Sequence, residues 1–288
     1  PDEVELVAVS GLEGIQRDRV LRVGTFFNEF PFAWLSDTGE VTGYEADILR
    51  SIGIELGIAI DFVQVTRNNA LESLLTGRVD ALIGQQILAD NRFELVDFTH
   101  PYYLNSERMV VRQDSPYGDL AQLAGQPVGV EISTRSERAL RQVGEQRGIA
   151  FDIRTYFSES DALDALANGE VEGMVGELDS LRRAGRQQMR LIDEPVMTEP
   201  YAIAVRRWDV NLRNLLNRSL QRLKASGRLD EIFDAWFPDD SIDFDILVPV
   251  YDALYADERG IDQFNADVPL PANPVMDRVA SGQPIRVA

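Results

Sequence analysis

Short apolar runs alternate with segments of helical periodicity from Val20 onward. Ile48, Ile52 and Leu56 are four residues apart, the spacing of one helix face. Apolar runs of four to eight residues between turn signals predict buried strands. The pattern predicts strands at 20–25, 58–65, 79–83, 127–130, 151–156 and 171–175, and helices at 44–56, 70–75, 136–147, 161–167, 211–224 and 229–236. This alternation indicates βαβ units and a mostly parallel sheet.

The alternation occurs twice, on either side of residues 104–119, so we expect two α/β lobes. After Pro238 an acidic stretch, a predicted short helix at 249–258 and a proline-rich linker follow. Residues 276–288 are similar to residues 15–25 in their apolar-Arg-Val strand start. Two interpretations stay open. Either the parent protein continues into a second copy of the domain, or the similarity between the two strand starts is a coincidence.

Composition excludes several classes of function. The 288 residues carry a formal net charge of −20, which argues against nucleic acid or an anionic membrane as a partner. No apolar run has the length that a membrane span needs. The chain begins at Pro1 without a charged and then apolar leader, so we expect a mature form or an excised piece.

The sequence offers few residues for metal or covalent chemistry. There is no cysteine, and His100 is the only histidine. The acidic residues 239–245 lack the spacing and the central glycine of a calcium loop. No glycine-rich phosphate loop is present. We therefore expect no metal, no cofactor and no enzymatic activity.

Several polar residues follow the carboxyl ends of predicted strands, where open α/β sheets bind ligands. Arg92 follows 79–83, and a guanidinium there can hold a carboxylate with two hydrogen bonds. Glu177 follows 171–175 and can hold an ammonium group. Thr134 and Arg135 precede a helix whose N-terminus favours anions. Each has a plainer interpretation, namely a surface arginine, a salt-bridged acid and an ordinary helix cap.

An ordered set of motifs from about Val20 to Phe237 resembles the family 3 periplasmic solute-binding proteins, the polar amino acid receptors of bacterial ABC uptake systems. The motifs are residues 21–25, 30–32, 43–49 (GYEADIL), 77–83 (GRVDALI), Arg92, 96–103 (VDFTHPYY), 123–130, Thr134, 168–172, 201–206 and 227–233 with 236–237.

The resemblance implies a type II periplasmic-binding-protein fold, an α/β fold in which two lobes joined by two hinge strands close over a ligand. Lobe 1 would comprise 20–103 plus 201–237, and lobe 2 residues 104–200. Residues 1–19 would form an N-terminal extension and 238–288 a C-terminal extension or linker. The protein would lie in the periplasm or outside the cell, with a membrane tether in the full-length form left open.

The resemblance also implies roles for individual residues. Arg92 matches the arginine that clamps the ligand α-carboxylate, Thr134 and its neighbour Arg135 match the helix start that faces it, and Glu177 takes the α-ammonium group. The residues expected around the ligand side chain are Phe30, Gln85, Arg67, Asn69 and Glu29, the last replacing an acid that the family has where this chain has Phe26.

We expect a small polar or acidic amino acid or a related carboxylate as the ligand, because Arg67 and Arg135 would otherwise lack anionic partners. An ABC permease is the expected partner. The alternative is a sensor domain, in which closure of the two lobes signals to an attached module. The extra segment after Pro238 favours this alternative. A dehydratase on the same fold is the remote third reading.

Overall fold

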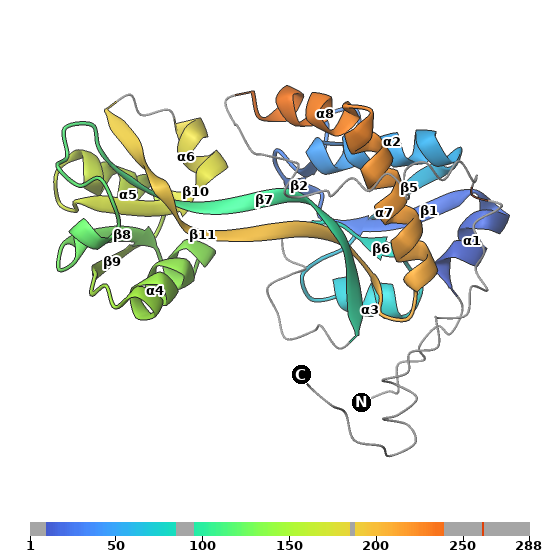
Figure 1. Ribbon diagram of the computed structural model, residues 1–288, viewed down its shortest axis with the longest axis horizontal. Coiled ribbons are helices and arrows are strands. Elements are labelled where there is room, and N and C mark those ends of the chain that lie inside the picture. The colour runs from blue at the N-terminus through green and yellow to red at the C-terminus, as the bar shows by residue number, and fades with distance from the viewer. Residues whose placement is uncertain (1–9, 85–94, 185–187, 239–260, 262–288) are drawn as a thin grey trace, which may run out of the picture. The chain divides into compact units, whose positions relative to one another are not determined.

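The chain folds into two compact units. The computed structural model describes residues 10–84, 95–184, 188–238 and 261. Unit 1 contains the residues up to Tyr102 and those from Tyr201 onward, and unit 2 is the stretch Tyr103–Pro200. The chain leaves unit 1 in β7 (Val96–Arg112) and returns to it in β11 (Met189–Arg206) (Figure 1).

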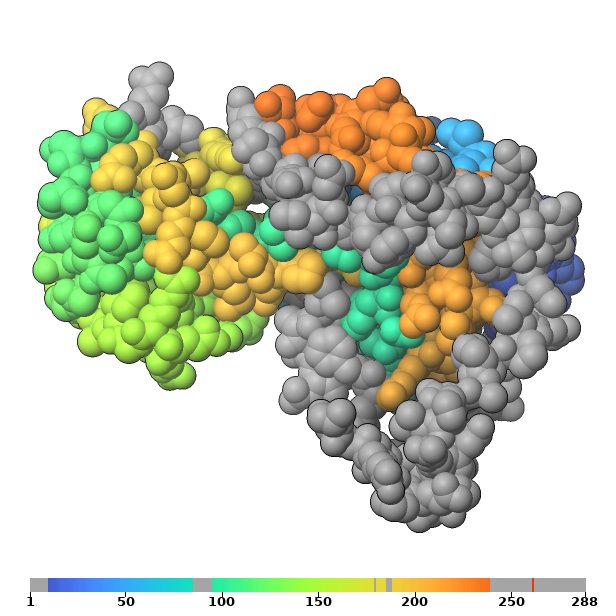
Figure 2. Space-filling view, viewed as in Figure 1, coloured from blue at the N-terminus to red at the C-terminus, as the bar shows by residue number. Residues whose placement is uncertain are grey.

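Unit 1 is a mixed sheet with helices packed against it. Its strands lie in the order β5 (Ala59–Gln64), β1 (Val20–Thr25), β6 (Ala81–Leu82) and β11. Strand β1 is parallel to β5 and β6, whereas β11 is antiparallel to β6. The helices are α1 (Gly11–Asp18), α2 (Tyr44–Leu56), α3 (Ala70–Leu75), α7 (Val210–Ala225) and α8 (Arg228–Trp236). Figure 2 shows α7 and α8, in orange, at the surface of this unit.

A small antiparallel sheet of unit 1 directs the chain into α2. It consists of β2 (Asn28–Glu29), β3 (Ala33–Leu35) and β4 (Val41–Thr42). Gly43 follows with φ of 132°, and a Cβ there would lie 2.2 Å from the main-chain oxygen of Phe32. Only glycine fits this approach, so Gly43 fixes where α2 begins.

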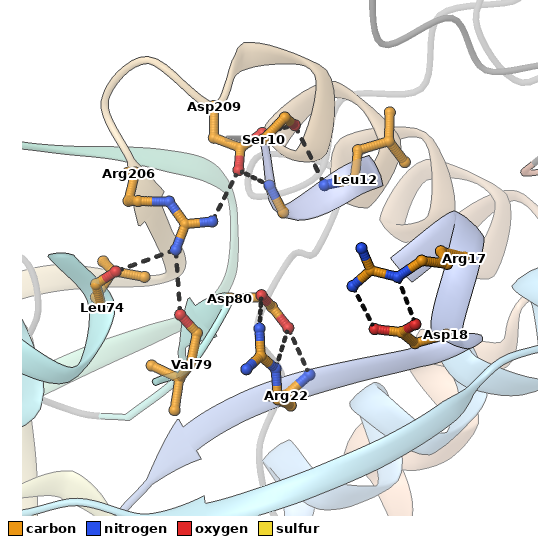
Figure 3. Close-up of polar contacts among 11 residues, drawn as sticks. Ser10, Leu12, Arg17, Asp18, Arg22, Leu74, Val79, Asp80, Arg206 and Asp209 are labelled. Atoms are coloured by element: carbon orange, nitrogen blue, oxygen red, sulfur yellow. Dashed lines mark hydrogen bonds and ion pairs between the residues drawn. The ribbon is translucent and has the colours of Figure 1, made fainter. Parts of the chain in front are cut away.

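Helix α1 is anchored to unit 1 through a buried carboxylate (Figure 3). Asp209 accepts hydrogen bonds from the main-chain N–H of Gly11 at 2.6 Å and from the hydroxyl of Ser10 at 2.5 Å. The same carboxylate pairs at 3.2 Å with Arg206, whose side chain is 1% exposed. Leu12 and Ile15 are buried as well. The expected N-terminal extension, residues 1–19, therefore contains a helix that belongs to unit 1.

Unit 2 is a sheet covered on both faces. Its strands lie in the order β7, β10 (Gly173–Glu177), β8 (Pro127–Glu131) and β9 (Asp152–Tyr156). Strand β8 is parallel to β9 and β10, and β10 is antiparallel to β7. The helices are η1 (Ala121–Leu123), α4 (Arg135–Arg147), α5 (Glu159–Ala167) and α6 (Leu178–Ala184).

The two faces of this sheet carry separate apolar clusters. Met109 and Val175 belong to the cluster that includes residues of α4. Val110 and Met174 belong to the cluster that includes residues of α5. Side chains alternate between faces along a strand, so these clusters identify which residues of β7 and β10 project towards α4.

The structure corrects two predicted strands. The strand expected at 171–175 is β10, two residues later, so Glu177 is its last residue rather than the residue beyond its end. The strand expected at 79–83 is only the pair Ala81–Leu82. The helix expected at 249–258 lies outside the described residues. Among the described helices, none has the length and apolar content to cross a membrane.

Candidate ligand-binding site

The N-terminus of α4 in unit 2 is a tightly capped turn. The hydroxyl of Thr134 accepts a hydrogen bond from the main-chain N–H of Glu137 at 3.3 Å and donates one to the main-chain oxygen of Glu131 at 2.6 Å. The carboxylate of Glu137 accepts from the main-chain N–H of Ser133 at 2.7 Å. These bonds fix the positive end of the helix dipole at the end of β8. Thr134 is therefore the helix cap, and its contact with a ligand stays a prediction.

Arg135, the first residue of α4, is paired with a carboxylate. Its Nε lies 3.4 Å from Oε2 of Glu199, and both side chains are largely buried. In Figure 2 the gold residues of β11 reach the surface of unit 2 beside the yellow-green α4. The positive charge of Arg135 thus has an anionic partner within unit 2.

Two glutamates face each other across neighbouring strands at the same edge of unit 2. Glu177 of β10 is opposite Glu107 of β7 in the antiparallel register, so both side chains project towards α4. Glu107 is 3% exposed and accepts a hydrogen bond at 2.6 Å from the hydroxyl of Ser136. Glu177 is partly buried, and its Oε1 atom is fully buried. Carboxylates directly opposite each other repel when both are ionised.

Burial raises the pKa of Glu107 above its ordinary value. Its hydrogen bond from Ser136 and the charge of Arg135 act in the other direction, whereas Glu199 and Glu159 raise the pKa further. Burial also raises the pKa of Glu159, which accepts a hydrogen bond at 2.6 Å from Ser180. The carboxyl group of Glu107 therefore holds its proton to a higher pH than an exposed glutamate does.

The sequence analysis did not single out Glu107, because a single acid in an apolar strand is typical of a solvent-facing position. A signal was present nonetheless. Residues 105, 107, 109 and 111 project to one face, and Met109 and Val111 identify that face as the core. An acid at the inward-facing position between them indicates a special role.

In unit 1 the structure brings two predicted site residues together. Glu29 ends β2, and its Oε1 lies 3.9 Å from the guanidinium of Arg67. The side chain of Arg67 is 64% exposed, so this pair contributes little to stability. The ring of Phe30 is exposed and lies 4.7 Å from that of Trp34. An exposed ring next to an ion pair at a strand end can contact a ligand.

Asn69 and Phe26 take structural positions in unit 1. Oδ1 of Asn69 accepts a hydrogen bond from the main-chain N–H of Thr66 at 2.8 Å, which stabilises the turn before α3. Phe26 packs in an apolar cluster with Val65 and Leu74. Phe26 thus takes a core position, where the resemblance implied an acid. The ligand contact predicted for Asn69 stays a prediction.

Arg92 and Gln85 lie outside the described residues. Their roles as carboxylate clamp and side-chain contact therefore rest on the sequence alone.

Unit 1 also contains a buried acid that the sequence analysis did not single out. Glu45 is 1% exposed and accepts a hydrogen bond at 2.5 Å from the hydroxyl of Tyr102, the last residue of unit 1 before the chain crosses. The hydroxyl of Tyr44 donates to the main-chain oxygen of Tyr102 at 2.7 Å. Burial raises the pKa of Glu45 to about 8, so the carboxyl group is largely protonated at neutral pH. The charge of Glu29 raises the pKa of Glu45 further, and the hydrogen bond to the buried Tyr102 gives this acid a packing role.

No group of three or more histidine, cysteine, aspartate or glutamate side chains suited to a metal ion occurs within the described part of the chain. The polar groups at the edge of unit 2 are instead hydrogen-bond acceptors and a helix N-terminus. Such groups can bind a small molecule that carries both a positive and a negative charge.

Known proteins with similar sequences include bacterial amino-acid-binding proteins. The chain is 24% identical over 230 residues to the probable amino-acid-binding protein YxeM of Bacillus subtilis, covering 77% of this chain and 86% of the relative. It is 26% identical over 216 residues to the ABC transporter arginine-binding protein 1 of Escherichia coli, covering 72% and 86%. These relatives are binding proteins and not enzymes.

A solved structure shares the fold. The ancestral cationic amino acid solute-binding protein AncCDT-1 superposes with a TM-score of 0.64 at 28% identity, covering 79% of this chain and all of that one. The model of the bacterial extracellular solute-binding proteins, family 3, matches residues 21–239. The match spans both units of the molecule. The chain therefore belongs to the bacterial extracellular solute-binding proteins of family 3.

Proposed function

We propose that this protein captures a small polar amino acid outside the cytoplasm for ABC-type uptake, and that its two units close over the ligand about β7 and β11. One observation carries this proposal. The N-terminus of α4 and the carboxylate of Glu177 are at the same edge of the sheet of unit 2, because β8 and β10 are parallel neighbours. An amino acid presents an anion and a cation a few bonds apart, which matches that pair of groups.

Each charged end of the ligand has a candidate partner. The α-carboxylate would contact Arg92, whose assignment comes from the sequence, and main-chain N–H groups at the start of α4. The α-ammonium group would contact Glu177. Phe30, Glu29 and Arg67 of unit 1 would surround the side chain, together with Gln85 from the sequence assignment.

The ion pairs of the structure remove one reason for an acidic ligand. Arg67 and Arg135 were expected to need anionic oxygens from the ligand, yet they lie 3.9 Å from Glu29 and 3.4 Å from Glu199. The proposal is therefore a polar amino acid bound through its backbone groups.

The comparisons favour a permease over an attached signalling module as the partner. The relative from Escherichia coli is named as part of an ABC transporter, and residues 21–239 match a family of extracellular solute-binding proteins. A periplasmic or extracellular place, with or without a membrane tether, fits that role.

Isothermal titration calorimetry with a panel of amino acids tests the proposal. Glu177→Gln removes the charge that holds the ammonium group, and Arg92→Ala removes the carboxylate clamp. We expect each to weaken binding by about 2–5 kcal/mol, because one charge of the ligand is left buried and unpaired. Glu145→Gln is the matched control, since Glu145 is exposed on α4. Unchanged affinity of Glu177→Gln for a ligand that the wild type binds would refute the assignment.

A further inference from the structure

The strands of unit 2 place a second carboxylate beside the one assigned to the ligand ammonium group. Glu107 and Glu177 are directly opposite in the β7–β10 register and project to the same face. The hydroxyl of Ser136, on the first turn of α4, donates to Glu107 at 2.6 Å. Glu107 is thus held at the sheet edge that carries the candidate site, next to the acid assigned to the ligand ammonium group.

A third acceptor lies on the same face. Asn105 precedes Glu107 by two residues on β7, so its side chain projects to the same side of the sheet. Asn105 is 2% exposed, and its Oδ1 atom has no hydrogen-bond partner among the described residues. A buried acceptor without a partner is costly, and a ligand that brings N–H donors would remove that cost.

Among the described residues, the charges near Glu107 lie on several neighbouring elements. Glu177 lies on β10, Glu199 on β11 and Glu159 on α5, whereas Arg135 on α4 is the cation that acts on it. Arg135 already pairs with Glu199. Acids therefore dominate the electrostatic surroundings of the Glu107–Glu177 pair, and acceptors dominate its hydrogen-bonding groups.

We propose that Glu107 is a specificity-determining residue that forms, with Glu177 and Asn105, a cation subsite selecting a positively charged amino acid over an uncharged or acidic one. This inference rests on the proposed function. Burial favours the protonated form of Glu107 in the empty protein. When the ligand binds, the O–H bond of Glu107 breaks, the proton passes to the buffer, and the carboxylate accepts an N–H group of the ligand.

Proton release separates this role from a purely structural one. A neutral Glu107 that only positions Ser136 would keep its proton during binding. Burial raises the pKa of Glu107, which supports the presence of that proton in the empty protein. Protons that the protein releases alter the observed heat of binding according to the ionisation enthalpy of the buffer.

Calorimetry with matched ligands provides the test. L-arginine and L-citrulline have nearly the same shape, but only arginine carries a charged side chain. We expect the wild type to bind arginine at least about tenfold more tightly than citrulline at about pH 7, and to release protons as it does so. L-glutamine and L-glutamate form a second pair, in which the acidic member should bind more weakly.

Glu107→Gln is the decisive variant, because its side-chain oxygen can still accept the hydrogen bond from Ser136. The preference for arginine over citrulline should fall towards unity, and proton release should disappear. Glu145→Gln is the control, since Glu145 is exposed on α4 and is not one of the charges that affect Glu107. It should retain both the preference and the proton release. A thermal melt confirms that each variant is folded.

Two results would overturn the inference while leaving amino acid binding intact. The first is equal affinity of the wild type for arginine and citrulline. The second is an unchanged preference and unchanged proton release in Glu107→Gln. If no amino acid binds to the wild type, the proposed function and the inference both fail.

Discussion

Among the residues that the structure describes, each unit buries one glutamate almost completely, and the two glutamates have different surroundings. Glu45 in unit 1 accepts a hydrogen bond from the hydroxyl of the buried Tyr102, whose main-chain oxygen is bonded to Tyr44. Glu107 in unit 2 lies at a sheet edge, opposite another acid and next to the N-terminus of α4. Burial raises the pKa of both carboxyl groups. A raised pKa alone therefore does not identify a binding site, and the acceptors and charges around the acid distinguish one role from the other.

The largest expected effect is on the pH dependence of stability, through Glu45. The pKa is about 8 in the folded protein and 4.5 ordinarily, so the folded state binds more protons between these values. The free energy of unfolding should therefore fall as the pH rises through this range, by up to about 1.4 kcal/mol per pH unit. Glu45→Gln should flatten that part of the profile, measured by urea unfolding from acid to mildly alkaline pH. An equally steep profile in the variant would assign the slope to other groups.

Tyr102→Phe tests whether the acid of unit 1 has only a packing role. The variant removes the donor to Glu45 and leaves a buried acceptor without its partner, which should cost about 1–3 kcal/mol of unfolding free energy. Ligand affinity should change little, because the hydroxyl of Tyr102 is bonded to Glu45 in the buried part of unit 1. A large loss of affinity at unchanged stability would contradict the distinction between the two acids.

Glu107→Gln tests how the buried acid of unit 2 affects the pH dependence of stability. Because the pKa of Glu107 is raised, its ionisation destabilises the folded protein as the pH rises. The empty variant should therefore be more stable than the wild type at alkaline pH and similar to it at acid pH. We expect a smaller gain than for Glu45→Gln, and a thermal melt at several pH values measures it. A loss of stability at every pH would contradict a raised pKa of Glu107 in the folded protein.

The smallest expected effect concerns the cap of α4. Thr134→Ala removes the hydroxyl that bonds to Glu131 and Glu137 and should cost about 1 kcal/mol of unfolding free energy. Thr134→Ser keeps the hydroxyl and serves as the control. If Thr134 also contacts the ligand, the alanine variant should lose affinity beyond what its lower stability explains, which calorimetry below the melting temperature measures.

The sequence predicted the helices and strands with strong periodicity. Helix α2 has the predicted bounds because Ile48, Ile52 and Leu56 form its buried stripe and Gly57 ends it in the left-handed conformation. The membership in family 3 and the α/β fold are confirmed by the comparisons. These features depend on local spacing, which a sequence records directly.

Other features depend on contacts between distant residues, which local patterns do not record. Helix α1 was not predicted, since its anchor is Asp209, 198 residues away from Gly11. Glu107 acquires its surroundings only when β7 pairs with β10 and α4 packs against them. The ion pairs of Arg67 and Arg135 were likewise not predicted. They remove the main reason for expecting an acidic ligand.

The contact between Asp209 and the start of α1 has a consequence for the order in which the chain folds. Unit 2 is one uninterrupted stretch of the chain, whereas unit 1 combines a segment before it with a segment after it. During synthesis unit 2 can therefore complete its core while unit 1 still lacks β11, α7 and Asp209. Unit 1 must close a loop of almost two hundred residues, a slow step that leaves its apolar surface exposed longest to chaperones and proteases.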